Sequence, residues 1–167
     1  MTWRVVPIEE QHIEGYWAVL GSVARERKYL AFLDAPPLEG VRGYALRNLR
    51  ENRPHFVALL DGTVVGWCDI ASLERPAFEH AGLLGMGVAA EHRGRGIGRE
   101  LLRATLENAR EMGLTRVELT VREPNARARE LYEKAGFAVE GLKRNAVRID
   151  DRYENLLCMA ILFHEGR

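Results

Sequence analysis

The stretch that decides the fold is "GVAAEHRGRGIGRELL" at residues 87–102, where Gly94, Gly96 and Gly98 stand directly before a leucine-bearing segment. Glycine inside a helix costs about 1 kcal/mol relative to alanine, so a chain that carries three of them here needs bare backbone close to another group. The first amides of a helix lack internal partners and carry partial positive charge. The pattern therefore predicts that phosphate or pyrophosphate binds where this helix begins.

Arginines surround these glycines, and the spacing separates several kinds of phosphate loop. Arg93, Arg95 and Arg99 bring positive charge to the rim of the predicted site. Arg99 stands where a dinucleotide-binding G-x-G-x-x-G motif has its last glycine, and the Lys followed by Ser or Thr of a nucleoside-triphosphate loop is missing. An arginine–glycine segment that binds RNA belongs to a longer, basic stretch of chain. A purely structural turn is the remaining alternative.

Composition and charge limit the class of protein. The chain has 167 residues, of which 47% are hydrophobic and 29% charged, with 24 basic and 24 acidic side chains. We expect one globular domain over residues 1–167, located in the cytosol, without a nucleic-acid or membrane partner. The N-terminus lacks the apolar centre of a signal peptide. Cys68 and Cys158 each lie in an apolar run, so we expect two buried free thiols rather than a disulfide, and no metal site.

Hydrophobic periodicity predicts an α/β (α+β) fold, in which helices cover both faces of a mixed sheet. Asp61-Gly62 is expected to turn a hairpin, and Gly85 and Gly87 interrupt the next strand, which indicates a bulge or a close approach to the backbone. The predicted strands are 2–8, the two arms of a hairpin over 55–70, 82–90, 115–122, 137–148 and 153–163, and the predicted helices are 10–28, 38–52, 97–112 and 126–135.

Two segments carry a resemblance to a known family. Arg93, Gly96 and Gly98 match an Arg/Gln-x-x-Gly-x-Gly/Ala signature, and "NARARELYEKAGF" at 125–137 matches an Asn, helix, Tyr and Gly-Phe pattern. In this order and spacing, the two segments resemble the GNAT superfamily of acetyl-CoA-dependent N-acetyltransferases. The C-terminal part of the chain resembles the branch that holds bacterial amino-acid N-acetyltransferases.

The resemblance implies both the shape of the sheet and the residues that hold the coenzyme. A mostly antiparallel sheet of about seven strands is expected to splay between the strands at 82–90 and 115–122. The opened strand edge would bind the pantetheine arm, and the loop amides would bind the pyrophosphate. Asn125 would contact the coenzyme or cap the following helix. The residues implied for acetyl-CoA are Met86, Gly87, Val88, Arg93, Gly94, Arg95, Gly96, Ile97, Gly98, Arg99 and Asn125.

Tyr132 is the catalytic residue that the resemblance implies, as the proton donor to the departing thiolate. A core aromatic with its hydroxyl bonded elsewhere is the alternative. No base for the amine is singled out, because Thr120 stands where acetyltransferases of ribosomal-protein termini carry a glutamate. The remaining base candidates, each expected to be a solvated polar residue instead, are Asp69, Glu79, His80 and Glu118.

The expected reaction is acetyl transfer to the primary amine of a small molecule, such as an amino acid, by direct attack in a ternary complex. Tyr29, Phe32 and Leu33 would line the acceptor side or pack in the core. Two alternatives stay open, namely an acetyltransferase of peptide or ribosomal-protein N-termini and a non-catalytic acetyl-CoA sensor. A homodimer is expected from the habit of the family.

Overall fold

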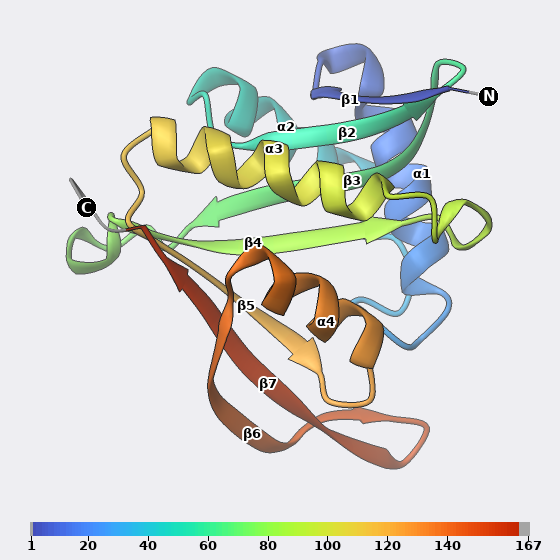
Figure 1. The fold of residues 1–167 in the computed structure, drawn as a ribbon. Coiled ribbons are helices and arrows are strands. Elements are labelled where there is room, and N and C mark those ends of the chain that lie inside the picture. Colours follow the sequence, from blue (N-terminus) through green and yellow to red (C-terminus); the bar gives the residue numbers. More distant parts are fainter. Residues whose placement is uncertain (1, 164–167) are drawn as a thin grey trace.

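The computed structural model describes residues 2–163, in which one seven-stranded sheet has the order β1-β2-β3-β4-β5-β7-β6 (Figure 1). The strands are β1 (Trp3–Pro7), β2 (His55–Leu60), β3 (Thr63–Ser72), β4 (Ala81–Val88), β5 (Arg116–Arg122), β6 (Ala138–Ile149) and β7 (Arg152–Leu162). The helices are α1 (Ile13–Ala24), α2 (Leu38–Arg50), α3 (Ile97–Glu111) and α4 (Ala126–Ala135), with short 3-10 turns η1 (Glu10–His12), η2 (Pro76–Phe78) and η3 (Ala90–His92). Of the described strand pairs, β4 and β5 alone run parallel, which confirms the prediction of a mixed, mostly antiparallel sheet.

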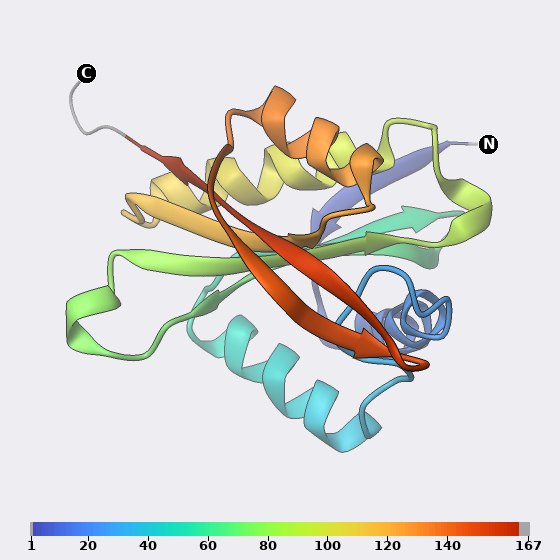
Figure 2. The same cartoon turned by 90° about the horizontal axis from the view of Figure 1, so that it is seen from below.

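Helices cover both faces of the sheet, as predicted: α3 and α4 lie on one face and α1 and α2 on the other (Figure 2). Alternate side chains of β3 point to opposite faces. Cys68 and Ile70 join the core beneath α3 and α4, whereas Trp67 packs among residues of α1 and α2. Because both faces of this central strand are buried, its sequence is a nearly continuous apolar run instead of an alternating one.

Most helix and turn predictions are confirmed, with differences at the ends. Leu102, Leu106 and Ala109 form the buried stripe of α3, whereas Met112, expected on the same stripe, is 43% exposed because the helix ends at Glu111. The predicted helix over 10–28 is η1 followed by α1, and it stops at Ala24. Residues 25–37 are therefore a loop, called here the α1–α2 loop, and this loop forms part of the candidate site.

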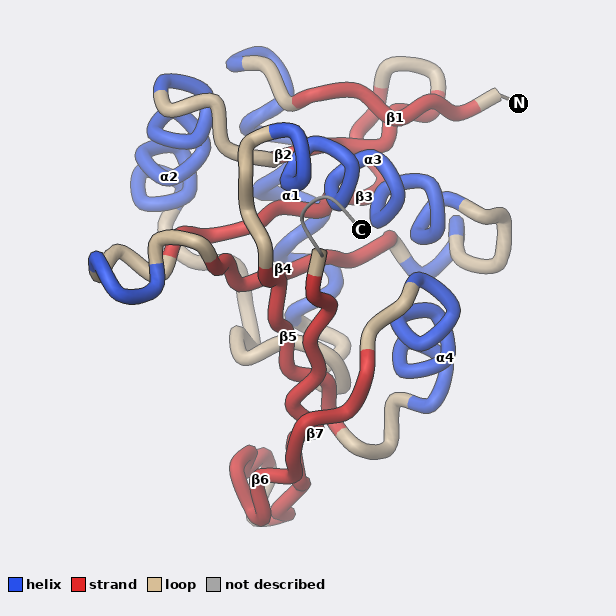
Figure 3. Tube along the Cα trace, turned by 60° about the vertical axis from the view of Figure 1, so that its left-hand side comes forward, coloured by secondary structure: helices blue, strands red, loops and turns tan. Residues whose placement is uncertain are grey.

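The last two strands form a hairpin that extends away from the rest of the sheet (Figure 3). Asp150 and Asp151 turn the chain with φ values of 52° and 61°, the left-handed values that a tight hairpin turn requires. Arg27 of the α1–α2 loop forms an ion pair with Asp150 at 2.8 Å. The hairpin thus stands beside the loop that connects the first two helices.

Two smaller expectations concern the cysteines and membrane spans. Cys68 is buried as predicted, but Cys158 is half-buried, because it alternates on β7 with the core residues Leu157 and Met159 and so faces the other side of the sheet. Both are free thiols. Within residues 2–163, no helix combines the length and the apolar character that a membrane span requires.

Candidate active site

The glycine loop, residues 93–98, follows η3 and includes the first two residues of α3. Gly94 and Gly96 have φ values of 81° and 85°, which are strained for any residue with a side chain. Gly96 is also the N-cap of α3, so the first turn of this helix receives no hydrogen bond from a capping side chain. The first amides of α3 therefore keep their hydrogen-bonding capacity for a ligand.

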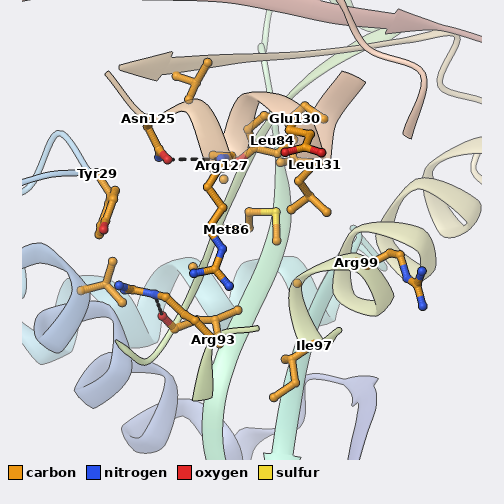
Figure 4. A pocket seen from close by; sticks show the side chains of 18 of the residues that line it. Tyr29, Leu84, Met86, Arg93, Ile97, Arg99, Asn125, Arg127, Glu130 and Leu131 are labelled. Atoms are coloured by element: carbon orange, nitrogen blue, oxygen red, sulfur yellow. Dashed lines mark hydrogen bonds between the residues drawn. The ribbon is translucent and has the colours of Figure 1, made fainter. Parts of the chain in front are cut away.

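A cavity of about 520 Å³ opens beside the loop and is bounded by β4, β5, α4 and the α1–α2 loop (Figure 4). The predicted residues that line it are Met86, Gly87, Val88, Arg93, Gly94, Gly96, Ile97, Gly98, Arg99, Asn125 and Tyr132. Arg95 is exposed and does not line the cavity. On the acceptor side, Tyr29 lines the cavity, whereas Phe32 and Leu33 are 49% and 37% exposed. The fold thus brings the two predicted sequence segments to one cavity.

The cavity continues into a gap between β4 and β5. These strands pair from Ala81 to Leu83 on β4, and the remainder of β4 has no described strand on that side. The amide of Ala89 donates to Val65 of β3 at 2.8 Å. Because hydrogen-bonding directions alternate along an antiparallel strand, the amides of Met86 and Val88 point the other way, into the gap. The predicted splay is confirmed.

Arg93 lines the cavity, but its charge is already paired. Its two terminal nitrogens donate to the Glu26 carboxylate at 2.9 and 2.6 Å, and Nε donates to the Val88 carbonyl at 2.9 Å. The guanidinium carbon also lies 4.8 Å from the centroid of the Tyr29 ring. Arg93 was expected to place free charge at the rim of the site. In the structure it joins the glycine loop to the α1–α2 loop instead.

A second arginine fixes the α1–α2 loop from the other side. Arg122, at the end of β5, is 3% exposed and donates to the backbone carbonyls of Arg27 at 2.8 Å and Leu30 at 2.6 Å. It also lies 3.4 Å from the Glu154 carboxylate. Sequence reasoning missed this residue, because an arginine at the end of a strand is usually exposed.

Arg127 is a cation beside the glycine loop that sequence reasoning missed. It belongs to the first turn of α4 and points into the cavity (Figure 4). A Cβ on Gly94 would lie 3.3 Å from its Nη2 atom, so the guanidinium stands directly over the glycine loop. Among residues 2–163 it has no ion-pair partner. The available signal was its place two residues after Asn125, at the start of a helix that the resemblance places beside the predicted coenzyme site.

Asn125 and Tyr132 hold α4 against the cavity. The Asn125 side chain accepts a hydrogen bond from the Ala128 amide at 3.2 Å, so the predicted cap is present. Tyr132 is 8% exposed, and its ring centroid lies 5.7 Å from that of Phe137. Its hydroxyl bonds to no residue between 2 and 163, and burial raises the pKa of Tyr132 well above its usual range. At neutral pH this hydroxyl is protonated and lies on the wall of the cavity.

The four base candidates have different environments. Glu79 and His80 are exposed, as expected, just after η2. Glu118 of β5 forms an ion pair with Arg116 at 3.0 Å. The expectation of a solvated side chain is wrong for Asp69, which is 7% exposed because α2 covers it on β3.

The fold and the cavity define the class of protein: the chain belongs to the acetyltransferase (GNAT) family, whose model matches residues 17–137. The sequence is 42% identical over 105 residues to the N-alpha-acetyltransferase RimI of Mycobacterium tuberculosis, covering 62% of this chain and 64% of the relative. It is 33% identical over 106 residues to the L-amino acid N-acetyltransferase AaaT of Escherichia coli, covering 63% of this chain and 65% of the relative. The matched regions span less than two thirds of either relative.

A solved structure shows the same architecture. The GNAT superfamily phosphinothricin acetyltransferase from Sinorhizobium meliloti, in complex with acetyl-CoA, superposes with a TM-score of 0.92. The superposition covers 99% of this chain and 91% of that chain, at 18% sequence identity. At this identity the similarity shows the fold alone.

Proposed function

We propose that this protein is an acetyl-CoA-dependent N-acetyltransferase that acetylates the primary amine of a small molecule, such as an amino acid. The observation that carries the proposal is the gap between β4 and β5, which opens from the glycine loop into a cavity walled by Tyr132. The gap has the free amides of the glycine loop at one end and the unpaired edge of β4 along its length. This arrangement suits a ligand that carries a diphosphate and an extended arm with amide groups.

The residues present fit coenzyme A. The amides from Gly94 to Arg99 would hold the pyrophosphate, and the unpaired guanidinium of Arg127 would add charge-assisted hydrogen bonds to phosphate oxygens. The amides of Met86 and Val88, which face the gap, would bond to the pantetheine arm. Acetyl-CoA supplies an activated thioester carbonyl, and this arrangement would aim it along β4.

The chemistry requires a neutral amine and a protonated leaving group. An alkyl amine has a pKa of about 10.4, so forming the free base at pH 7 costs about 4–5 kcal/mol. The nitrogen would attack the thioester carbonyl, and Tyr132 would give its proton to the departing thiolate. Tyr132 can serve as this donor because its hydroxyl is protonated at neutral pH and bonds to no residue between 2 and 163, and Tyr132 lines the cavity.

The acceptor would approach from the face of the sheet that carries α1, α2 and their loop. The similarity to an L-amino acid N-acetyltransferase supports a small amine, as does Thr120 in the place of a glutamate. The similarity to an N-alpha-acetyltransferase favours a second candidate, the N-terminus of a peptide or protein. A homodimer remains part of the proposal on family habit, and a light-scattering mass of one chain would remove it.

Two measurements test the proposal. Calorimetry with acetyl-CoA reports binding, and thiol release with free amino acids, polyamines and N-terminal peptides reports transfer. Turnover of free amino acids would support the small-amine acceptor, whereas turnover of peptides alone would support the second candidate. Binding without thiol release would instead indicate a sensor, and absence of binding would refute the coenzyme site itself.

A further inference from the structure

A buried carboxylate lies beside the point where β4 leaves β5. Asp69 of β3 pairs with Gly85 of β4, and Gly85 lies just beyond Leu83, the last residue of β4 that pairs with β5. Residues two apart on a strand share a face, so Asp69 lies on the same face as Trp67, under α1 and α2. Asp69 therefore stands on the acceptor side of the gap, whereas Tyr132 belongs to the core of the opposite face.

One carboxylate oxygen of Asp69 is held by a hydrogen bond, and the other has no hydrogen-bond partner among residues 2–163. The Tyr44 hydroxyl of α2 donates a hydrogen bond to Oδ2, whereas Oδ1 accepts none from residues 2–163. A Cβ on Gly85 would lie 3.7 Å from Oδ1, and Gly85 is an exposed residue that lines the cavity. Gly85, which lines the cavity, thus places no side chain over Oδ1.

The two tyrosines and the histidine that face Asp69 are neutral at physiological pH. Burial raises the pKa of Tyr16 of α1 and of Tyr44 far above their usual range, so both hydroxyls are protonated. Burial lowers the pKa of His55 of β2 to about 4, so its imidazole is uncharged. Arg53, which precedes β2, acts electrostatically on Tyr44. Burial raises the pKa of Asp69 itself to about 7, and the Tyr44 hydrogen bond opposes that rise.

Glu118, the other candidate carboxylate on this face of the sheet, is less suited than Asp69 to accept a proton from an amine. Glu118 of β5 also lies beside Leu83, but its carboxylate accepts a hydrogen bond from Arg116 Nε at 3.0 Å. Its side chain is 33% exposed and thus in contact with water. Asp69, in contrast, has one free oxygen in a site that is closed on its other sides.

We propose, on the basis of the proposed function, that Asp69 is the catalytic residue that accepts the proton of the acceptor ammonium. One proton passes from nitrogen to Oδ1 and then to solvent. The free amine attacks the thioester carbonyl, and the carbon–sulfur bond breaks as Tyr132 gives its proton to sulfur. The second proton, lost from nitrogen after the carbon–nitrogen bond forms, restores Tyr132. The products are the amide, the free thiol and one released proton.

The first test is the pH profile of kcat/KM for Asp69→Asn, with Asp61→Asn in the exposed β2–β3 turn as the matched control. We expect the Asp69 variant to lose about 100-fold or more in kcat/KM at pH 7 while binding acetyl-CoA as tightly as the wild type. Its rate should keep rising with pH toward the pKa of the amine, whereas the wild-type rate should level off above about pH 8.

Two further variants test the geometry, because Asp69→Asn disturbs a buried site. Gly85→Ala fits at ordinary contact distance and should lower turnover by covering Oδ1, with coenzyme binding unchanged. Tyr44→Phe removes the hydrogen bond that favours the ionised carboxylate, so the acid limb of the profile should move to higher pH.

The outcomes separate this inference from the proposed function. Full turnover in Asp69→Asn, or loss of the pH limb in Glu118→Gln instead, would overturn the assignment of Asp69 and leave the acetyltransferase intact. An unchanged profile in both Gly85→Ala and Tyr44→Phe would also overturn it. A wild-type protein that binds acetyl-CoA but acetylates no amine would overturn both proposals.

Discussion

Gly87 of β4 tests whether packing against Trp67 excludes a side chain at this position. A Cβ at this position would lie 2.4 Å from Cη2 and 2.6 Å from Cζ3 of the Trp67 ring. The ring cannot move away cheaply, because Trp67 is 3% exposed and packs against Tyr16 with centroids 5.9 Å apart. Overpacking a core typically costs about 1–3 kcal/mol. We therefore expect Gly87→Ala to destabilise the protein by about that amount.

Gly85→Ala is the matched control, because it lies on the same strand and the same face, with its nearest contact at 3.7 Å. Both substitutions reduce the entropy of the unfolded chain equally, so the difference between them isolates the contact with Trp67. For a chain of this length, about 2–4 °C of Tm accompanies each kcal/mol. Thermal unfolding followed by circular dichroism should place Gly87→Ala about 2–12 °C below Gly85→Ala. Equal melting temperatures would refute the packing argument.

Three further predictions address catalysis, coenzyme binding and pH. Tyr132→Phe should lower kcat by about 100-fold with an unchanged acetyl-CoA Kd in calorimetry, and equal losses in both would mark a structural role. Arg127→Ala should weaken the binding of acetyl-CoA at least about 10-fold. Arg129→Ala, which breaks an exposed ion pair with a neighbouring glutamate, should leave that binding unchanged. Equal affinities of the two variants would exclude Arg127 from the phosphate site. Asp69 has a folded pKa of about 7 against 3.8 unfolded, so its contribution to stability falls as pH rises from 4 to 7. His55 has a folded pKa of about 4 against 6.5 unfolded, so its contribution rises with pH over nearly the same window. The two effects oppose each other in the wild type, and Asp69→Asn removes one of them. From pH 4 to 6.5, the stability of Asp69→Asn in denaturant unfolding should therefore rise by about 3 kcal/mol relative to that of the wild type. Parallel curves of stability against pH would contradict this expectation.

The sequence by itself determined the features that depend on neighbouring residues. The left-handed turns at Gly94 and Gly96, the helix that follows and the Asn125 cap are local, because each is set by the conformations open to a few consecutive residues. Periodicity likewise determined the order of strands and helices. The family pattern then linked two such segments and predicted the gap between β4 and β5.

Tertiary structure alone decided which charged side chains are paired, which are buried and which one lies over the glycine loop. Arg93 is paired because Glu26, 67 residues away, lies beside it. Arg127 stands over Gly94 only because α4 packs next to the glycine loop. The carboxylate of Asp69 is buried because α2 crosses β3 and brings the Tyr44 hydroxyl to it. Spacing along a chain reports which face a side chain shares, but desolvation and charge pairing depend on the segment that packs against that face.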